Sequence, residues 1–348
     1  MKVLKIKINA KKELGIRKQK KRKYTIPIFI PHRGCKNDCV FCNQRRISGE
    51  TKDVSIKDVK EKIDKYLSYY NLESNPIIEV AFFGGSFTGL DIKEQQAYLE
   101  IVKPYIIKNI VSHIRISTRP DYIDDEILKM LKRYNVQVIE LGVQSMDNAV
   151  LKKAKRGHTK EDVINASILV KKYSFKLGHQ IMIGLPESSI ETESKSIKES
   201  ILLKPDYMRI YPVYILKNSE LWNMYEKDQY KELSLEEAVI RTKKVYQECV
   251  KNKIDVIRVG LQTTEEISEH NKEIKGPVSD NYKERVLSSI MLDNMIKKIN
   301  KKRNIAKFNL IQIMVPKEQI NYAVGNNKEN ICKLKERYRI NVHIKAIT

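Results

Sequence analysis

The stretch Cys35-Lys36-Asn37-Asp38-Cys39-Val40-Phe41-Cys42 follows an apolar run, Thr25 to Pro31, and decides how the rest of the chain is interpreted. Three thiolates at C-x3-C-x2-C spacing suit a [4Fe–4S] cube, because each fills one corner and one iron stays open for chemistry. A zinc site needs four ligands, or three and a water. His32 could be the fourth, but no second C-x2-C or H-x3-H pair lies nearby. The spacing therefore favours an iron–sulfur cluster over zinc.

Length and composition predict an ordinary enzyme body. The 348 residues are 41% apolar, which is enough for one large α/β domain and something small. The five cysteines are an odd number, no apolar signal peptide opens the chain, and no run approaches the length of a membrane span. We therefore expect a cytoplasmic protein without disulfides and without a membrane partner.

The net charge of +23 is concentrated at the two ends of the chain. Residues 1–24 hold 11 Lys and Arg against one acidic residue, and residues 296–348 hold 13 against three. A genome rich in Lys codons would explain the total but not this distribution. Basic ends predict a polyanionic partner, with nucleic acid as the usual candidate and an anionic membrane surface as a weaker one.

Apolar runs alternate with amphipathic stretches from Thr25 onward, which predicts a parallel sheet with right-handed crossovers. Strands are expected at 25–31, 77–83, 112–117, 136–143, 176–183 and 206–213, and helices near 56–70, 93–108, 123–134, 159–173 and 190–203. A helix near 234–252 and a seventh strand at 255–260 are expected to follow. An open doubly wound sheet and a partial barrel both satisfy this order, and both place functional groups at the carboxyl ends of the strands.

The last forty residues begin a new pattern. Phe308 to Val315 alternates like a strand, Pro316 can open a helix, Gly325 interrupts before a second helix, and Ile340 to Ile344 is a final strand. We read this β-α-α-β order as a separate small domain. The predicted domains are a basic N-terminal arm at 1–24, an α/β barrel at 25–275, a basic helical linker at 276–305 and the small unit at 306–348.

Several polar motifs follow the predicted strands. Phe82-Phe83-Gly84-Gly85-Ser86-Phe87 ends the second strand, and two glycines there let backbone approach a ligand closely. Ser117-Thr118-Arg119-Pro120-Asp121 follows the third strand, and Glu140-Leu141-Gly142-Val143-Gln144 closes the fourth. The fifth leads into Gln180 to Glu187. A carboxylate can pair with ribose hydroxyls and an arginine can bind a carboxylate, although each could instead be a salt-bridged rim residue.

The first strand and its loop resemble the cluster loop of radical S-adenosylmethionine enzymes, in which an aromatic residue precedes the last cysteine. The resemblance implies a partial (β/α)6-type barrel and two cofactors, a [4Fe–4S] cluster held by Cys35, Cys39 and Cys42 and S-adenosylmethionine on the fourth iron. These cysteines would be both metal ligands and catalytic residues. It also implies that the cofactor contacts are Phe41, Gly84, Gly85, Ser86, Ser117, Arg119, Glu140, Gln144 and Ile183.

The resemblance gives these contacts their roles. Phe41 would lie against the adenine, and the glycine pair would hold the amino group. Glu140 and Gln144 would bind ribose or the methionine part, and Arg119 a carboxylate or the substrate. A reducing protein such as ferredoxin or flavodoxin would supply electrons, and the enzyme would be oxygen-sensitive.

The run FFGGSF, STRPDYID, ELGVQSMD, KRGHT and MIGLPE is similar to the radical domain of the elongator catalytic-subunit family, over about residues 25–275. That resemblance implies modification of the wobble uridine of transfer RNA. Larger members carry an acetyltransferase domain with a Gly-rich loop, and this sequence shows no such loop.

The small unit resembles a KH domain, whose G-x-x-G loop between two helices clamps single-stranded RNA; Lys328 replaces the second glycine here. The predicted RNA contacts are Lys18, Lys20, Lys21, Arg22 and Lys23 in the arm and Gly325, Asn326, Asn327 and Lys328 in the loop. Two other functions stay open. One is a radical enzyme acting on a small molecule, similar to the coproporphyrinogen-oxidase-like enzymes. The other is a noncatalytic RNA-binding protein with a structural metal.

Overall fold

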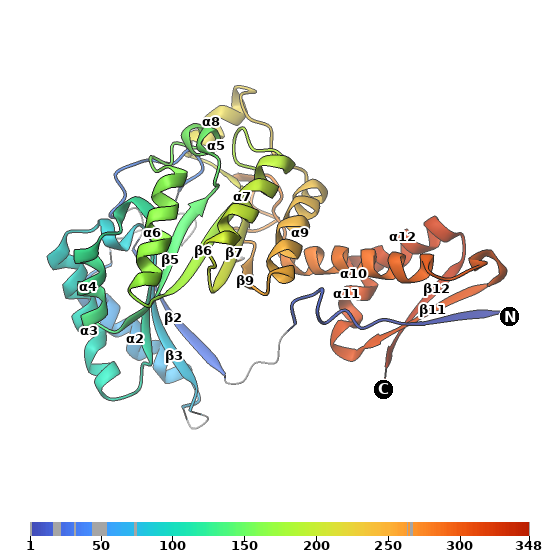
Figure 1. Cartoon of the computed structure of the whole chain (residues 1–348), viewed down its shortest axis with the longest axis horizontal. Helices are drawn as coiled ribbons and strands as arrows, with labels where there is room; N and C mark the ends of the chain where they lie inside the picture. The colour runs from blue at the N-terminus through green and yellow to red at the C-terminus, as the bar shows by residue number, and fades with distance from the viewer. Residues whose placement is uncertain are drawn as a thin grey trace.

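The computed structural model describes residues 2–16, 22–30, 33–43, 54–72, 75–262, 264 and 267–347. A curled seven-stranded parallel sheet forms a half-barrel, and a small C-terminal domain lies beside it (Figure 1). The strands lie in chain order: β2 (Lys23–Ile30), β3 (Ile77–Gly84), β4 (His113–Thr118), β5 (Val136–Gln144), β6 (Lys176–Ile183), β7 (Tyr207–Pro212) and β9 (Asp255–Val259). The predicted α/β class and partial barrel are confirmed.

The strand order explains where the helices lie. Because the order never reverses and crossovers between parallel strands are right-handed as a rule, the connecting helices cover one face of the sheet and leave the other as the barrel interior. The helices are α2 (Ile56–Tyr69), α3 (Ile92–Ile107), α4 (Asp125–Arg133), α5 (Asn148–Lys153), α6 (Lys160–Lys172), α7 (Ile190–Leu202), α8 (Glu220–Glu226) and α9 (Leu235–Lys251). Side-chain caps fix several starts; Ser55 and Thr159, for example, form capping boxes with the third helical residue.

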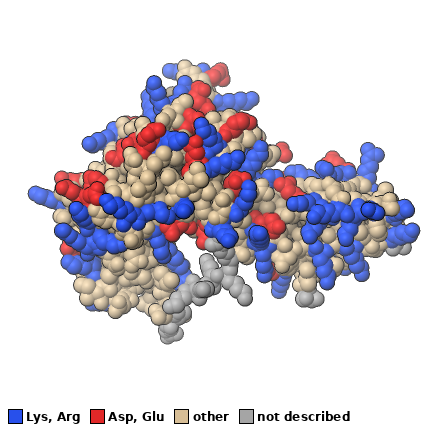
Figure 2. Space-filling view, in the orientation of Figure 1, with Lys and Arg blue, Asp and Glu red and all other residues tan. Residues whose placement is uncertain are grey.

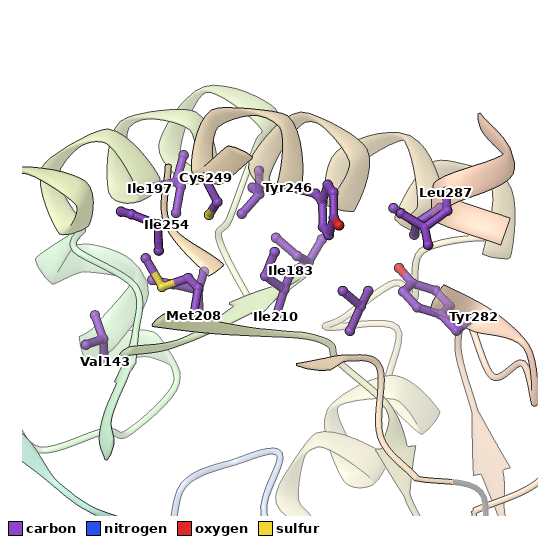
Figure 3. Packing of buried hydrophobic residues seen from close by; sticks show 14 of the residues in the cluster. Val143, Ile183, Ile197, Met208, Ile210, Tyr246, Cys249, Ile254, Tyr282 and Leu287 are labelled. Atoms are coloured by element: carbon purple, nitrogen blue, oxygen red, sulfur yellow. The ribbon is translucent and has the colours of Figure 1, made fainter. Parts of the chain in front are cut away.

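Alternate residues of each strand face the helices and form the main core. Figure 3 shows this packing where Ile183, Met208 and Ile210 of the sheet meet Ile197 of α7 and Cys249 of α9. The opposite alternation includes charged side chains such as Arg115, Glu140 and Arg209, which line the interior of the half-barrel. The core thus holds the sheet rigid from outside while the inner face stays available for chemistry.

Strand β2 is an edge strand, paired only with β3 among the described residues. Pro27 lies in its middle and has no backbone N–H to donate. A proline is tolerated in a sheet where one side of the strand needs no partner. The first strand of the barrel, and the cysteine loop that follows it, therefore lie at one side of the sheet.

The small domain contains a three-stranded parallel sheet in the order β1 (Val3–Lys7), β11 (Leu310–Pro316) and β12 (Asn341–Ile347). Its helices are α10 (Tyr282–Asn300), α11 (Ile320–Val324) and α12 (Glu329–Tyr338). The expected β-α-α-β order is present. The segment expected as a basic arm behaves differently, because residues 3–7 are an edge strand of this sheet and not an extended appendage.

Alternating apolar residues explain that strand. Leu4, Ile6 and Ile8 are buried between the lysines of the N-terminal segment. Beyond the strand, the buried Gln319 accepts a hydrogen bond from the Ala10 amide at 2.9 Å. The segment then reaches the barrel, where the Tyr246 hydroxyl of α9 donates to the Leu14 carbonyl at 2.8 Å. The N-terminal segment therefore ties the small domain to the barrel.

Two short strands, β8 (Ile215–Leu216) and β10 (Ile274–Lys275), pair antiparallel beyond the main sheet. No helix within the described part of the chain is both long and apolar enough to cross a bilayer. Lys and Arg side chains are dense on the visible face of the small domain, whereas both signs of charge mix over the barrel (Figure 2).

Candidate active site

The cysteine loop after β2 is locked to the glycine-rich loop after β3. The Gly85 amide donates to the Ile30 carbonyl at 2.7 Å, and the Ser86 amide donates to the Arg33 carbonyl at 3.0 Å. A Cβ on Gly85 would lie 2.8 Å from the Ile30 oxygen and would collide with the Arg33 oxygen. Only glycine permits so close an approach of two backbones. The two motifs that the sequence placed on neighbouring strands are therefore one structural unit.

Cys35, Cys39 and Cys42 are reduced cysteines on one short loop. The Cys35 sulfur lies 3.3 Å from the Ser86 hydroxyl, and the buried Cys39 sulfur accepts a hydrogen bond from Nη1 of Arg156 at 3.1 Å. The Cys42 amide donates to the Cys39 carbonyl at 2.9 Å, which closes the turn between these two cysteines. Both neighbours of the sulfurs are donors suited to thiolates.

The donor set fits a cluster better than a single ion. In the part of the chain that the structure describes, no three His, Cys, Asp or Glu side chains gather closely enough to bind one metal ion. A [4Fe–4S] cube does not need such a gathering, because each thiolate binds a different iron atom. Three reduced thiols on one loop at the carboxyl edge of a parallel sheet are a donor set of that kind.

An apolar cluster supports the cysteine loop. Val40 and Phe41 are buried in it, together with Cys39. The Val40 amide donates to the Ala154 carbonyl at 3.2 Å, and the Val40 carbonyl accepts from the Leu221 amide at 2.7 Å. The loop is thus held by backbone bonds on both sides. Phe41, predicted to contact adenine, lies at this buried end of the loop.

Two buried arginines lie beside the loop with unused donors. Arg119 is 2% exposed and binds Asp121 through Nε and Nη2 at 3.0 and 2.7 Å, and its Nη1 has no partner among the described residues. Arg156 spans from Cys39 to the Gly142 carbonyl, to which Nη2 donates at 2.9 Å, and its Nε is likewise without a described partner. Burial opposes the charge of Arg119, but the hydrogen bond and charge of Asp121 and the neighbouring Cys39 raise its pKa overall. A buried donor without a partner marks a position for an anionic ligand.

His158 follows Arg156 in the same loop and is neutral at physiological pH. Burial, together with the charges of Arg156 and Arg119, lowers the pKa of His158 to about 3. One ring nitrogen lies 3.2 Å from the Val143 carbonyl. The other has no partner among the described residues.

Glu140 and Ser117 face the barrel interior and are bonded to each other. The Ser117 hydroxyl donates to Oε2 of Glu140 at 2.9 Å, and Nη1 of Arg115 donates to Oε1 at 2.8 Å. Nε of Arg209 lies 2.9 Å from the same oxygen. The carboxylate predicted to bind ribose or methionine is therefore held by two arginines below the rim of the sheet.

Gln144 and Ile183 end β5 and β6 at the same edge of the sheet. Gln144 is buried, has a left-handed backbone (φ +64°) and accepts a hydrogen bond from Gln180 at 3.3 Å. A left-handed φ is uncommon for a residue other than glycine, and such strain gathers at functional sites. The buried Ile183 leads into Gly184, whose carbonyl accepts from the Tyr230 hydroxyl at 2.6 Å. A cavity of about 260 Å³ lies there, between residues 184–188 and 229–233.

The predicted RNA contacts are distributed over two places. Lys18, Lys20 and Lys21 lie outside the described residues. Lys23 begins β2 and pairs with the buried Glu79 at 2.8 Å. Arg22 lies over the ring of Tyr24, 5.8 Å from its centre.

The predicted loop Gly325, Asn326, Asn327 and Lys328 joins α11 to α12, and three of its residues have a left-handed φ. Asn326 accepts a hydrogen bond from Nδ2 of Asn281 at 3.0 Å, so that the loop packs against the start of α10.

A buried chain of charges was not anticipated from the sequence. Nη2 of Arg115 donates to Glu79 at 3.0 Å, and through Glu140 the chain continues to Arg209. Burial would raise the pKa of Glu79, but the hydrogen bond to His113 and the charge of Arg115 lower it overall. The sequence did contain a signal for this chain, because charged residues occupy inward-facing positions in strands that are otherwise apolar. Arg156 entered the sequence analysis only within the run KRGHT, since nothing local indicates that its guanidinium reaches Cys39.

Family models match most of the chain. The radical SAM superfamily model covers residues 29–197, and the Radical_SAM C-terminal domain model covers residues 205–291. The solved structure of an archaeal Elp3 of Methanocaldococcus infernus with an N-terminal deletion has a TM-score of 0.59 at 24% identity, over 78% of this chain and 63% of that one. This likeness concerns the fold alone.

Curated relatives match over shorter stretches. A tRNA uridine(34) acetyltransferase of Methanocaldococcus infernus is 32% identical over 183 residues, which are 47% of this chain and 34% of that protein. An oxygen-independent coproporphyrinogen-III oxidase-like protein of Bacillus subtilis is 26% identical over 222 residues, which are 61% of this chain and 43% of that protein. The chain thus spans about a third of the length of the first of these relatives and less than half of the second.

Proposed function

Because the chain belongs to the radical S-adenosylmethionine superfamily, we propose that it holds a [4Fe–4S] cluster, cleaves S-adenosylmethionine and modifies transfer RNA at the wobble uridine. The observation that carries the proposal is the cysteine loop locked onto Gly85 at the carboxyl edge of a parallel half-barrel. The RNA substrate is supported by the relative named tRNA uridine(34) acetyltransferase and by the basic small domain.

Cys35, Cys39 and Cys42 would hold the cluster. The Ser86 hydroxyl and the Arg156 guanidinium would stabilise two of the thiolates by hydrogen bonds, since charge-assisted donors are stronger than neutral ones. When bound, the two cofactors supply electron transfer and hydrogen-atom abstraction, chemistry that belongs to them and not to the protein. The protein orients the cofactors against the substrate and excludes water.

The other residues on this edge would bind S-adenosylmethionine. Backbone carbonyls at Gly84 and Gly85 would receive the amino group, and Nη1 of Arg119, which has no partner among the described residues, would receive a carboxylate. Gln144 would contact ribose or the methionine part. Glu140, held by Ser117 below the rim of the sheet, would bind ribose or the methionine part from there. Phe41 and Ile183 would lie against the adenine. Neutral His158 would not add positive charge beside the two arginines.

The small domain would grip RNA phosphates in the manner of a KH unit, with its loop between α11 and α12. A reduced ferredoxin or flavodoxin would be the electron donor, and the enzyme would work in the cytoplasm. The support for the KH reading is the β-α-α-β order with a left-handed loop between the helices.

The test is anaerobic reconstitution with iron and sulfide, followed by measurement of 5′-deoxyadenosine after dithionite and S-adenosylmethionine are added. We expect cluster absorption and product in the wild type, and loss of both in Cys39→Ser. Cys332→Ser is the matched control, because Cys332 is exposed on α12. This variant should keep both the cluster absorption and the product. Zinc without iron in anaerobically purified protein would instead support a noncatalytic protein with a structural metal.

The substrate is tested separately. Nucleosides of a tRNA transcript with uridine at position 34 are analysed by mass spectrometry after incubation with the reconstituted enzyme. A second candidate is a small-molecule substrate, favoured by the coproporphyrinogen-oxidase-like relative, which matches a longer stretch of the chain. The salt dependence of binding distinguishes the two substrates. For RNA, the logarithm of the affinity falls with the logarithm of the salt concentration with a slope of about −0.7 to −0.9 per phosphate contact, whereas the affinity for a small molecule should change little with salt.

A further inference from the structure

The three-stranded sheet of the small domain has one face that no helix of the described residues covers. The buried residues of the helix side are Leu4, Ile6, Ile311, Ile313, Val315 and Val342, whereas Lys5, Lys7, His343 and Lys345 on the opposite alternation are exposed to solvent. We call this surface the open sheet face. Its two central rows hold Lys5, Lys7, Gln312, Met314, His343 and Lys345, and its end rows hold Val3, Leu310 and Asn341 on one side and Pro316 and Ile347 on the other.

Strand register arranges these side chains in two rows. Lys5, Gln312 and His343 are partners across the three strands, and Lys7, Met314 and Lys345 form the next row. Alternate residues of a strand are about 7 Å apart, and two strand spacings are about 10 Å. The cations therefore lie along the two edges of the face, with neutral side chains between them.

The face has a strong bias of charge. Strands β1, β11 and β12 contain three lysines and a histidine and no Asp or Glu. Lys5, Lys7 and Lys345 form no ion pair with any part of the chain that the structure describes. Elsewhere in the small domain several lysines are neutralised, for example Lys11 by Glu318 at 2.8 Å. The open sheet face thus keeps its full positive charge for an external partner.

We propose that the open sheet face binds the phosphate backbone of the RNA substrate, an inference that rests on the proposed function. The 7 Å between Lys5 and Lys7 equals the axial rise of about two nucleotide steps in a helical strand. A strand lying between the two edges would place phosphates against the lysines. Gln312 and the polarisable thioether of Met314 would then meet sugar or base.

Charge and polarity favour RNA over a bilayer. Membrane-surface elements pair a basic face with an extended apolar one that enters the acyl region. Here the two central rows contain one apolar side chain, Met314. The other apolar residues lie in the end rows, with Val3 and the 9%-exposed Leu310 at one end and Pro316 and Ile347 at the other. The loop at residues 325–328 is a separate feature, because it joins the helices that cover the other side of the sheet and is bonded to Asn281.

The experiment measures binding of a fluorescently labelled tRNA transcript to the full-length protein over a range of salt. The test variant combines Lys5→Ala, Lys7→Ala and Lys345→Ala. The matched control removes three exposed lysines of the barrel helices α2, α3 and α4, namely Lys60, Lys93 and Lys129. Circular dichroism confirms that both variants are folded.

If each lysine of the face binds one phosphate, each contributes about 0.7 to the salt slope, and the slope falls by about 2 in the test variant. At 0.1 M salt a slope of about 0.7 corresponds to about a fivefold gain in affinity per phosphate contact, so the loss of three contacts should weaken binding about 100-fold. The control should keep both the affinity and the slope. Release of 5′-deoxyadenosine in the absence of RNA should be unchanged in both variants.

Each failure has its own signature. Equal affinities of the test variant and the control overturn the role of the open sheet face while leaving RNA as the substrate. A wild type that binds the transcript without salt dependence overturns the RNA substrate itself, and this inference with it. Loss of binding to phosphatidylserine vesicles, with RNA binding intact, would identify the face as a membrane surface and refute the proposal.

Discussion

Replacing Gly85 with alanine should displace the cysteine loop without unfolding the barrel. The added Cβ would lie 2.8 Å from the Ile30 carbonyl oxygen, 0.6 Å short of the ordinary contact distance of 3.4 Å, and still closer to the Arg33 oxygen. Both atoms are backbone and cannot rotate away. Since β2 is fixed by its pairing with β3, the movement falls on Arg33, two residues before Cys35.

The expected size follows from packing and from catalytic geometry. Overpacking of this kind costs about 1–3 kcal/mol of stability, which a domain of this size tolerates. A misplacement of about 1 Å in a reacting group lowers rates by about 100-fold. We therefore expect Gly85→Ala to fold, to bind less iron after anaerobic reconstitution and to form 5′-deoxyadenosine about 100-fold more slowly.

The assay compares iron and sulfide per chain, 5′-deoxyadenosine yield and urea unfolding for the wild type and two variants. Gly260→Ala is the control, because Gly260 also follows a strand of the same sheet and its added Cβ meets the Tyr282 side chain at 3.2 Å, away from the cysteines. That variant should lose stability and keep its iron. Wild-type iron content and wild-type cleavage in Gly85→Ala would refute the argument that the two loops are one unit.

Three further substitutions test the rest of the structure. Glu79→Gln removes the buried carboxylate that binds Arg115, so the free energy of unfolding measured in urea should fall by about 3 kcal/mol. The control Glu61→Gln changes an exposed residue and should cost almost nothing. Equal losses in the two variants would contradict the buried charge chain. Burial lowers the pKa of His179 to about 3 from an unfolded value near 6.5. The unfolded chain therefore binds a proton below pH 6.5 that the folded protein does not, and the free energy of unfolding falls as the pH falls from 6.5 toward 3. Between pH 6.5 and 5 the wild type should lose about 2 kcal/mol more than His179→Asn in pH-dependent urea unfolding, and parallel curves would exclude a neutral buried histidine. Ile6→Ala, in β1, should cost about 2–5 kcal/mol by the same method while the neighbouring Lys5→Ala costs little, whereas an unstructured arm would make both harmless.

Much of the barrel was predictable because its signals are local. Apolar runs of six to eight residues separated by amphipathic helices determine the strands, and the parallel order follows from the crossovers between them. Carboxyl ends of neighbouring parallel strands must meet at one edge, which is why Cys35 and Gly85 could be placed together from sequence alone. The structure adds a close backbone contact that no spacing rule indicates.

The remaining features depend on distant partners. The lysines of strand β1 made it look like a charged arm rather than a strand. Its pairing with β11 joins Val3 to Leu310, about 300 residues apart, so that no short window of sequence contains both. The reach of Arg156 to Cys39 spans 117 residues and depends on how two loops fold over each other. Strands β8 and β10 have two residues each, too few for any periodicity. Non-local pairing of this kind is decided by the whole fold.

The pairing of β1 with β11 has a consequence for how the molecule is made. A ribosome adding about 5–20 residues per second finishes β11 roughly 15–60 s after β1 has emerged. Throughout that interval the barrel can fold while the N-terminal strand has no sheet to join. The first strand to be synthesised is therefore among the last to reach its native place, and nascent chains halted before residue 310 would display its unpaired edge to chaperones.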